Sequence, residues 1–155
     1  MAARIPTQQD FEAFDGAHGP VIWARLAADW RCPSCDRSKF EILRWTRRFP
    51  NQLVSPGAKP YMGWLAVVHG HHDHATDTFD NPSPALLPRF PVTEICDQCN
   101  TADGTAKRKL GLPSTWSFSP QEIGQFVTAT PHSPHVLDFD IAATIYHANV
   151  ESRAA

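Results

Sequence analysis

The pattern of apolar and polar residues predicts short strands and helices joined by ordered loops. Apolar and polar side chains alternate, imperfectly, along Lys39–Arg48, as they do in a strand with two different faces. Aromatic and β-branched residues make Tyr61–His69 a second predicted strand, and Phe90–Ile95 is a third. The segment that starts at Asn100 is rich in Ala and Lys, and it predicts a helix that ends at Gly111.

Further helices are predicted on both sides of these strands. Near the N-terminus, Thr7 is placed to cap a short helix, and the apolar residues of Val21–Trp30 have roughly helical spacing. Ser119 precedes a Pro at the first helical position and has Glu122 three residues after it, which is the pattern of a capping box. A last helix is expected at about Phe139–Val150, and its expected buried residues are Ile141, Ala142, Ile145 and Ala148.

Composition favours one domain. The chain has 155 residues, of which 42% are apolar and 19% charged, so it can bury a core. Its 14 prolines favour long loops over a helical bundle. The longest apolar run, Trp64–Val68, is too short to cross a bilayer, and the first residues lack the apolar core of a secretory signal. We therefore expect one cytoplasmic domain over residues 1–155, with no membrane partner.

The net charge of −2 argues mildly against a nonspecific nucleic-acid binder, which would usually be basic. Two local clusters matter more than the total charge. They give five candidate DNA-binding residues, namely Arg47, Arg48, Lys107, Arg108 and Lys109. For both clusters, the alternative is a solvated face with no ligand.

All four cysteines fall into two Cys-x-x-Cys pairs, which are Cys32 with Cys35 and Cys96 with Cys99. In a reducing compartment, two such turns can direct four thiolates at one tetrahedral zinc ion. A disulfide framework is disfavoured by the expected cytoplasmic location. A redox pair would explain one Cys-x-x-Cys but not two. The spacing therefore predicts a structural Zn²⁺ site.

The stretch Val67–Asp77 lies between the two cysteine pairs and holds half of the eight histidines, namely His69, His71, His72 and His74. Two aspartates, Asp73 and Asp77, stand among them, and Asn100 directly follows the last cysteine. Adjacent imidazoles repel one another once protonated, whereas a divalent metal binds them in the neutral form. The alternatives are a solvated loop or additional zinc ligands.

The zinc site would bring a strand end and a helix start close together. One imidazole and the Asn100 oxygen could then bind a divalent cation. A neighbouring imidazole, which points to the other side of the strand, could activate water. Phosphodiester hydrolysis needs this combination of a Lewis acid and a general base.

The combined pattern resembles the HNH, or ββα-metal, endonucleases. The His71-His72-Asp73 run looks like the His-His-Asp of the colicin-type DNases. The order of the two cysteine pairs, the histidine string and Asn100 is similar to zinc-containing phage endonucleases that resolve branched DNA. The resemblance covers about residues 32–110, and it leaves a helical extension at about 119–150. It implies an α+β fold, in which flanking helices surround a small ββα-metal (His-Me finger) core that a four-cysteine zinc site holds together.

The resemblance also implies roles for single residues. His72 matches the general base, and His71 and Asn100 match the ligands of a catalytic Mg²⁺ or Mn²⁺. His74 and Thr76 match supporting positions. Asn81 is the candidate, by order alone, for the middle asparagine of the family name. The expected products of DNA cleavage carry 5′-phosphate and 3′-hydroxyl ends.

Three alternatives stay open at this point. In a shifted register, Asp73 is the metal ligand and His74 is the base. The chain could instead be a noncatalytic zinc-ribbon adaptor that binds nucleic acid or protein, or a metal-dependent hydrolase of another substrate.

A homodimer is a reasonable expectation for an enzyme that cuts both strands. Three histidines of the C-terminal part, namely His132, His135 and His147, are expected to be surface or packing residues.

Overall fold

The computed structural model describes residues 2–77 and 87–154, and within these ranges it is a mixture of short helices and small sheets. The helices are α1 (Gln8–Ala13), α2 (Pro20–Arg25), α3 (Lys39–Ile42), a 3-10 turn η1 (His74–Thr76), α4 (Asp97–Leu110), α5 (Pro120–Phe126) and α6 (Phe139–Ala154). The strands are β1 (Arg44–Arg48), β2 (Tyr61–Leu65), β3 (Val68–His71), β4 (Thr93–Cys96), β5 (Val127–Thr128) and β6 (Val136–Leu137). They form antiparallel pairs β1–β2, β3–β4 and β5–β6.

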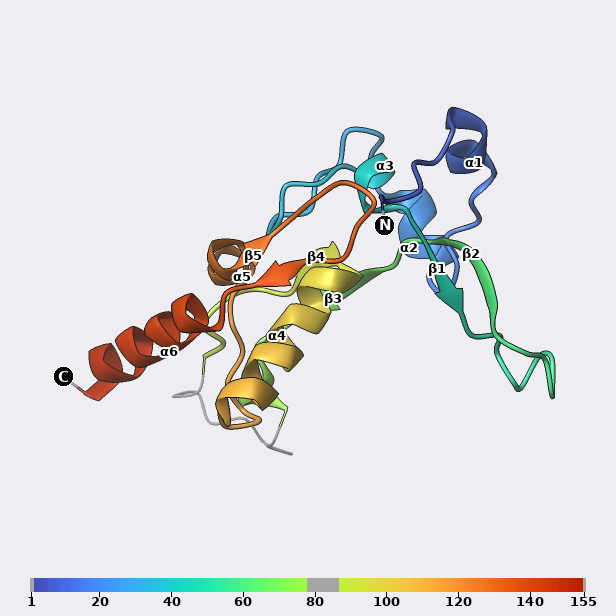
Figure 1. The fold of residues 1–155 in the computed structure, drawn as a ribbon. Helices are drawn as coiled ribbons and strands as arrows, with labels where there is room; N and C mark the ends of the chain where they lie inside the picture. Colours follow the sequence, from blue (N-terminus) through green and yellow to red (C-terminus); the bar gives the residue numbers. More distant parts are fainter. Residues whose placement is uncertain (1, 78–86, 155) are drawn as a thin grey trace.

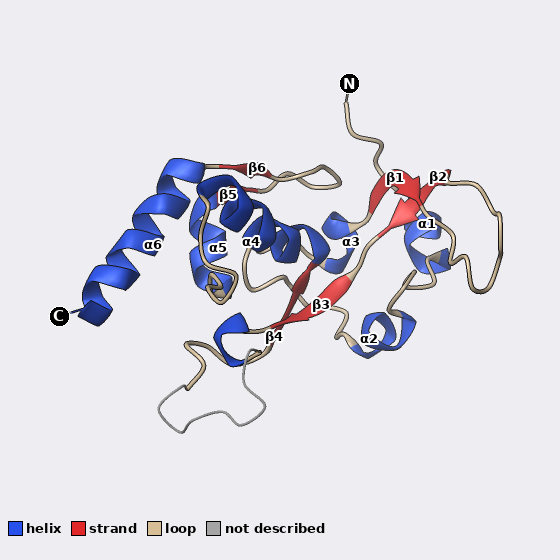
Figure 2. Cartoon of the chain, turned by 90° about the horizontal axis from the view of Figure 1, so that it is seen from below, coloured by secondary structure: helices blue, strands red, loops and turns tan. Residues whose placement is uncertain are grey.

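The β3–β4 pair and α4 occupy the middle of the molecule. α4 packs against β3 and β4 on one side and against α5 and α6 on the other. Figures 1 and 2 show α5 and α6 at one end, and α1, α2 and the β1–β2 hairpin at the opposite end. None of the helices in the described part of the chain is both long and apolar enough to cross a membrane.

The core surrounds the cysteines. Cys32, Cys96 and Cys99 are buried together with Ile95 from β4 and Phe118 from the segment before α5. Phe118 packs edge-on against Phe126 of α5, and Trp116 packs in the same way against Phe118. Burial of these rings ties the helical end of the chain to the β3–β4 pair.

The predicted strand Lys39–Arg48 is half wrong, because its first part is the helical turn α3. Ser38 caps this turn: its hydroxyl accepts from the Glu41 N–H at 3.2 Å, and its own N–H donates to the Glu41 carboxylate at 2.7 Å. This capping box satisfies backbone groups locally and overrides the alternating pattern. Only Arg44–Arg48 forms a strand.

The predicted strand Tyr61–His69 is two strands that belong to different sheets. β2 pairs with β1, so that Trp64 stands opposite Trp45. β3 pairs with β4, so that His71 stands opposite Thr93. β4 itself begins three residues later than the predicted strand and ends at a cysteine. The sequence therefore indicated the strand that delivers the histidines, but not the change of partner.

The capping predictions for the helices are confirmed. Thr7 and Ser119 form capping boxes at α1 and α5, and Gly111 ends α4 in the left-handed conformation with φ 63°. α2 is shorter than predicted, and α4 begins at Asp97, before the second cysteine of its pair.

The predicted inward face of α6 is only partly right. Ala142 is fully buried and Ile145 packs on the core, but Ile141 is 41% exposed and Ala148 is exposed. The stripe that faces the core continues through Tyr146, so it follows residues i, i+3 and i+4 from Ala142. Ile141 and Ala148 lie beside this stripe.

Candidate metal centres

The two Cys-x-x-Cys pairs meet in the structure. The four sulfur atoms lie within 4.8 Å of one another, and the Cys32–Cys99 and Cys35–Cys96 pairs are each 3.8 Å apart. Sulfurs bound at about 2.3 Å to a tetrahedral zinc ion stand about 3.8 Å from one another. The cluster therefore fits a structural zinc ion, as predicted, and all four cysteines are free of disulfide bonds.

The ionisation of these thiols is strongly interdependent. Hydrogen bonding with the Cys32 thiol lowers the pKa of Cys35 and raises the pKa values of Cys96 and Cys99. One thiolate in this small volume makes the next more costly to form. A divalent cation removes this conflict, because it stabilises all four thiolates together.

Arg37 is a partner of the cluster that the sequence did not reveal. It is only 3% exposed, and its guanidinium donates to the sulfurs of Cys35 at 3.4 Å and Cys96 at 3.5 Å. Burial disfavours its charged form, but the neighbouring sulfurs outweigh this and raise the pKa of Arg37. The same guanidinium donates to the Ser133 carbonyl at 3.1 Å, which ties the β5–β6 hairpin to the cysteines.

His135 also lies at the cysteine cluster. Its Nε2 is 3.2 Å from the Cys99 sulfur and 3.4 Å from the Arg37 guanidinium. We expected a surface or packing residue, and nothing in the sequence links it to a cysteine pair 36 positions earlier. His132 does pack in the interior, where its Nδ1 donates to the Leu43 carbonyl at 2.7 Å, and His147 is exposed.

The end of β3 brings His71 to Asn100 on α4. His71 is 2% exposed, and its ring stacks on Phe90 with the ring centres 5.3 Å apart. Its Nδ1 lies 3.1 Å from the Asn100 Oδ1 atom, and its Nε2 lies 2.7 Å from the Phe118 carbonyl oxygen. The two residues predicted as catalytic metal ligands are thus side by side.

The Phe118 carbonyl determines which His71 nitrogen is available to a metal. A carbonyl oxygen only accepts, so Nε2 carries the ring proton and a neutral ring has its lone pair on Nδ1. This lone pair then faces the Asn100 oxygen. A cation between the two atoms satisfies both, and ligands about 2.1 Å from an octahedral ion stand about 3.0 Å apart. The other solution is a turned Asn100 amide that donates to Nδ1.

His72 and His74 lie on the more exposed side of this segment, where both reach Asp77. The Asp77 carboxylate is 2.7 Å from the Nδ1 atom of His74 and 3.1 Å from the Nε2 atom of His72. Hydrogen bonds from His74 and then from His72 lower the pKa of Asp77, so this side chain is an ionised acceptor at neutral pH.

Asp73 is buried, and both of its carboxylate oxygens accept from backbone groups. One accepts from the Ala75 N–H at 3.1 Å, and the other accepts from the Arg89 N–H at 2.8 Å. Through these bonds Asp73 caps the turn η1 and holds the segment that follows residues 78–86. Asn81 falls in that range and lies outside the described residues, as does the side chain of Thr76.

The basic candidates differ in accessibility. Lys107 points inward, where it is 2.9 Å from the Trp116 carbonyl and 3.1 Å from the carboxylate of Asp103. Asp103 in turn accepts from the Phe118 N–H at 2.8 Å, so this lysine supports the segment that orients His71. The exposed candidates are Arg47, Arg108 and Lys109, whereas Arg48 is half-buried and donates to the Trp64 carbonyl at 3.3 Å.

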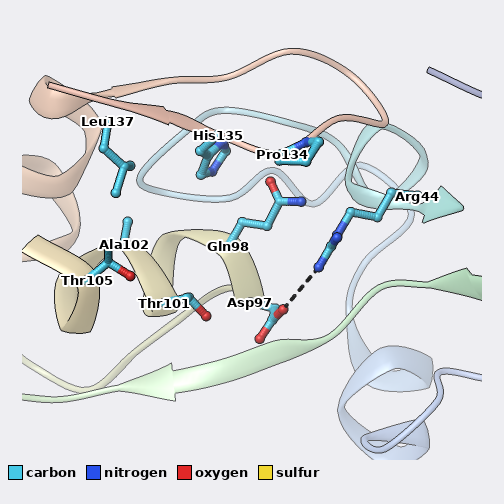
Figure 3. A pocket seen from close by; sticks show the side chains of 9 residues that line it. All are labelled: Arg44, Asp97, Gln98, Thr101, Ala102, Thr105, Pro134, His135 and Leu137. Atoms are coloured by element: carbon cyan, nitrogen blue, oxygen red, sulfur yellow. Dashed lines mark ion pairs between the residues drawn. The ribbon is translucent and has the colours of Figure 1, made fainter. Parts of the chain in front are cut away.

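Two pockets flank α4. The first, which we call the α4 pocket, has a volume of about 470 Å³ and is lined by His74, Gly104, Lys107, Arg108, Gly111, Leu112 and Ser114. The second pocket has a volume of about 260 Å³ and lies between the start of α4, Arg44 and the segment around His135 (Figure 3). At its edge, Arg44 forms an ion pair with Asp97 at 3.7 Å. Of the two, only the α4 pocket borders a histidine of the Val67–Asp77 stretch.

The chain matches no protein-family model, no curated protein and no solved structure.

Proposed function

We propose that this protein is a metal-dependent endonuclease of the HNH type that hydrolyses DNA phosphodiester bonds. The observation that carries the proposal is the approach of His71 to Asn100, 3.1 Å apart, beside a four-cysteine cluster. The elements β3, β4 and α4 follow one another in the order that a ββα-metal core requires. Residues 29 positions apart are thereby presented together at one strand end.

In this proposal His71 and Asn100 hold Mg²⁺ or Mn²⁺ through an imidazole nitrogen and an amide oxygen. When bound, the cation offsets charge on the scissile phosphate and on the leaving 3′ oxygen. Burial of His71 and its bond to Phe118 fix the direction of the Nδ1 lone pair. Both oxygens of Asp73 already accept from backbone N–H groups. This favours the register in which His71 is the metal ligand over the one in which Asp73 is.

His72 is the proposed general base. An ionised Asp77 accepts from Nε2–H of His72, which leaves the lone pair of the neutral ring on Nδ1. Nδ1 takes a proton from water as the water oxygen attacks phosphorus. The bond from phosphorus to the 3′ oxygen then breaks and the released 3′ oxygen takes a proton from solvent, so the products carry a 5′-phosphate and a 3′-hydroxyl.

The charge distribution supports a nucleic-acid substrate. Between Glu41 and Asp73 the chain has four basic and no acidic residues, so this stretch carries +4 while the rest carries −6. Three of the four stand on β1, where Arg44 pairs with Asp97, Arg48 is half-buried and Arg47 is exposed. Arg108 provides a further cation at the α4 pocket, beside His74. Phosphate groups are the partners that such separated positive charge favours.

A noncatalytic zinc-dependent adaptor is the second candidate. It corresponds to the alternative in which the Asn100 amide is turned and donates to the Nδ1 atom of His71, because this bond needs no cation. An adaptor keeps the cysteines and the core but has no requirement for Mg²⁺ or Mn²⁺.

The two candidates are separated by a nicking assay on supercoiled plasmid, branched DNA and RNA. The zinc-loaded protein is tested with Mg²⁺, with Mn²⁺ and with neither ion, and zinc content is measured in every sample. Cleavage of DNA that depends on the added ion is the expected result. Binding of DNA without cleavage of any substrate under any of these conditions supports the adaptor and contradicts the endonuclease.

A further inference from the structure

A second group of metal-type ligands includes the proposed base, His72. His72, His74 and Asp77 bring one ligand atom each to within 4.8 Å of one another. The two imidazole rings are 4.6 Å apart between their centres, and the Asp77 oxygen lies between their nitrogens. Nitrogen and oxygen ligands of one tetrahedral zinc ion stand about 3.3 Å apart, so the three atoms need only small movements to share an ion.

The ligand types distinguish this group from the other two centres. Two imidazoles and one carboxylate suit Zn²⁺ and other transition metals, whereas Mg²⁺ prefers oxygen ligands. The side chains of His72, His74 and Asp77 are 42%, 37% and 45% exposed, so an ion held by all three keeps an open position toward solvent. Both imidazoles already point their nitrogens at the same carboxylate oxygen.

We propose that His72, His74 and Asp77 form a transition-metal site, separate from the four-cysteine cluster and from the His71–Asn100 pair, and that an ion bound there stops proton transfer at His72. The second part rests on the proposed function. An ion on Nε2 of His72 shifts the ring proton to Nδ1, because a neutral ring carries one proton. The ring then has no lone pair left for water, so the bound ion and the base are mutually exclusive.

The first experiment measures zinc binding directly. Protein that already holds its structural zinc is dialysed against micromolar Zn²⁺, and bound zinc per chain is counted for wild type and variants. We expect a second zinc in wild type, loss of that zinc in Asp77→Ala and His74→Gln, and its retention in Asn100→Ala and in the exposed-histidine control His147→Gln. A wild type that binds only the structural zinc, or a second zinc that persists in both Asp77→Ala and His74→Gln, overturns the site.

The second experiment tests the block on the base. For each protein, nicking with Mg²⁺ is compared with and without added Zn²⁺, and the ratio of the two rates is reported, so that differences in basal rate cancel. Zinc is expected to slow wild type and His147→Gln by at least about 10-fold and to leave Asp77→Ala nearly unaffected. Equal slowing of wild type and Asp77→Ala contradicts the block. If no variant nicks DNA, the proposed function fails, while the zinc count still decides whether the site exists.

Discussion

The Nδ1 atom of His71 faces the Oδ1 atom of Asn100 at 3.1 Å, while the opposite ring nitrogen, Nε2, donates to the Phe118 carbonyl. Three separate parts of the chain, β3, α4 and the segment before α5, thus determine the direction of one lone pair. The Asp103 carboxylate accepts from the Phe118 N–H and so holds this segment in place, and Lys107 pairs with Asp103. The proposed cation site is therefore supported from the interior of the protein.

Replacement of Asn100 tests whether the pair binds a cation. Asn100→Ala removes one of two ligands, so the affinity for Mn²⁺ is expected to fall by at least about 10-fold. Thr101→Ala, at the next and exposed position on α4, is the control and keeps wild-type affinity. Manganese titration followed by electron paramagnetic resonance measures both. Unchanged Mn²⁺ affinity together with lower thermal stability in Asn100→Ala would show that the amide only donates to His71.

The basic residues of α4 are expected to divide into two kinds. Arg108→Gln and Lys109→Gln remove exposed charges, so each lowers the slope of log affinity for DNA against log salt concentration by about 1. Lys107→Gln instead leaves the 4%-exposed carboxylate of Asp103 without its cation and costs about 3 kcal/mol of unfolding free energy. Fluorescence anisotropy, measured on a His72→Ala background without Mg²⁺, gives the slopes, and urea unfolding gives the stability. A salt slope that falls equally for Lys107→Gln would contradict its assignment to the interior.

The Arg89–Glu122 ion pair predicts a particular loss of stability in acid. The two side chains are 13% and 15% exposed and 2.9 Å apart. Burial raises the pKa of Glu122, but hydrogen bonds from Arg89 and from the Ser119 N–H outweigh it, and the net pKa lies below the ordinary 4.5. Stability from this group is therefore fully present above pH 4.5 and is lost as the pH falls through the lower, folded-state pKa.

Glu122→Gln should accordingly reduce the unfolding free energy at neutral pH by about 3 kcal/mol, with a smaller difference from wild type in acid. Urea unfolding at a series of pH values measures this difference. Glu151→Gln, at an exposed position on α6, serves as the control and should show little change at any pH. A Glu122→Gln deficit that stays constant from neutral pH down to acid would exclude the ion pair as its cause.

Two helix glycines should respond to alanine with opposite signs. Helix propensity alone predicts that each Gly→Ala change stabilises by about 1 kcal/mol. At Gly104 an added Cβ meets only the tip of the Arg108 side chain, so this gain is expected. At Gly124 the Cβ would overlap the backbone carbonyl of Ser34, between the two cysteines of the first pair. We therefore expect Gly124→Ala to lower the melting temperature and to weaken zinc retention, and equal stabilisation by both changes would contradict the packing of α5 on this turn.

Sequence patterns predicted the elements whose signals are local. The capping boxes at Thr7 and Ser119 and the left-handed Gly111 each depend on neighbours within a few residues, and they occur as predicted. The predicted strand Tyr61–His69 divides into β2, which pairs with β1, and β3, which pairs with β4. This change of partner could not be predicted, because strand partners are set by segments far apart in sequence. The capping box of Ser38 and Glu41 is also a local signal, and in the structure it prevails over the imperfect alternation of Lys39–Arg48.

In the candidate site, too, the sequence predicted only the residues that carry a local signal. Regular spacing identified the cysteines, and position after the last cysteine identified Asn100. Arg37 and His135 carry no spacing signal, because each reaches the cysteines through tertiary packing alone. The inward direction of Lys107 likewise depends on Asp103 and on the Trp116 carbonyl, so a run of three basic residues gave no indication of it.

The proposed role of His72 as the base of a metal-dependent nuclease is tested by comparing His72→Ala with wild type. Supercoiled plasmid is incubated with Mg²⁺ or Mn²⁺ and either wild type, His72→Ala or the exposed-histidine control His147→Gln, each verified as folded and zinc-loaded. Wild type and His147→Gln are expected to nick the plasmid, and His72→Ala is expected to be slower by about 100-fold or more. Nicking by His72→Ala at the wild-type rate would exclude His72 as the base, and loss of nicking in His74→Ala alone would transfer the role of base to His74.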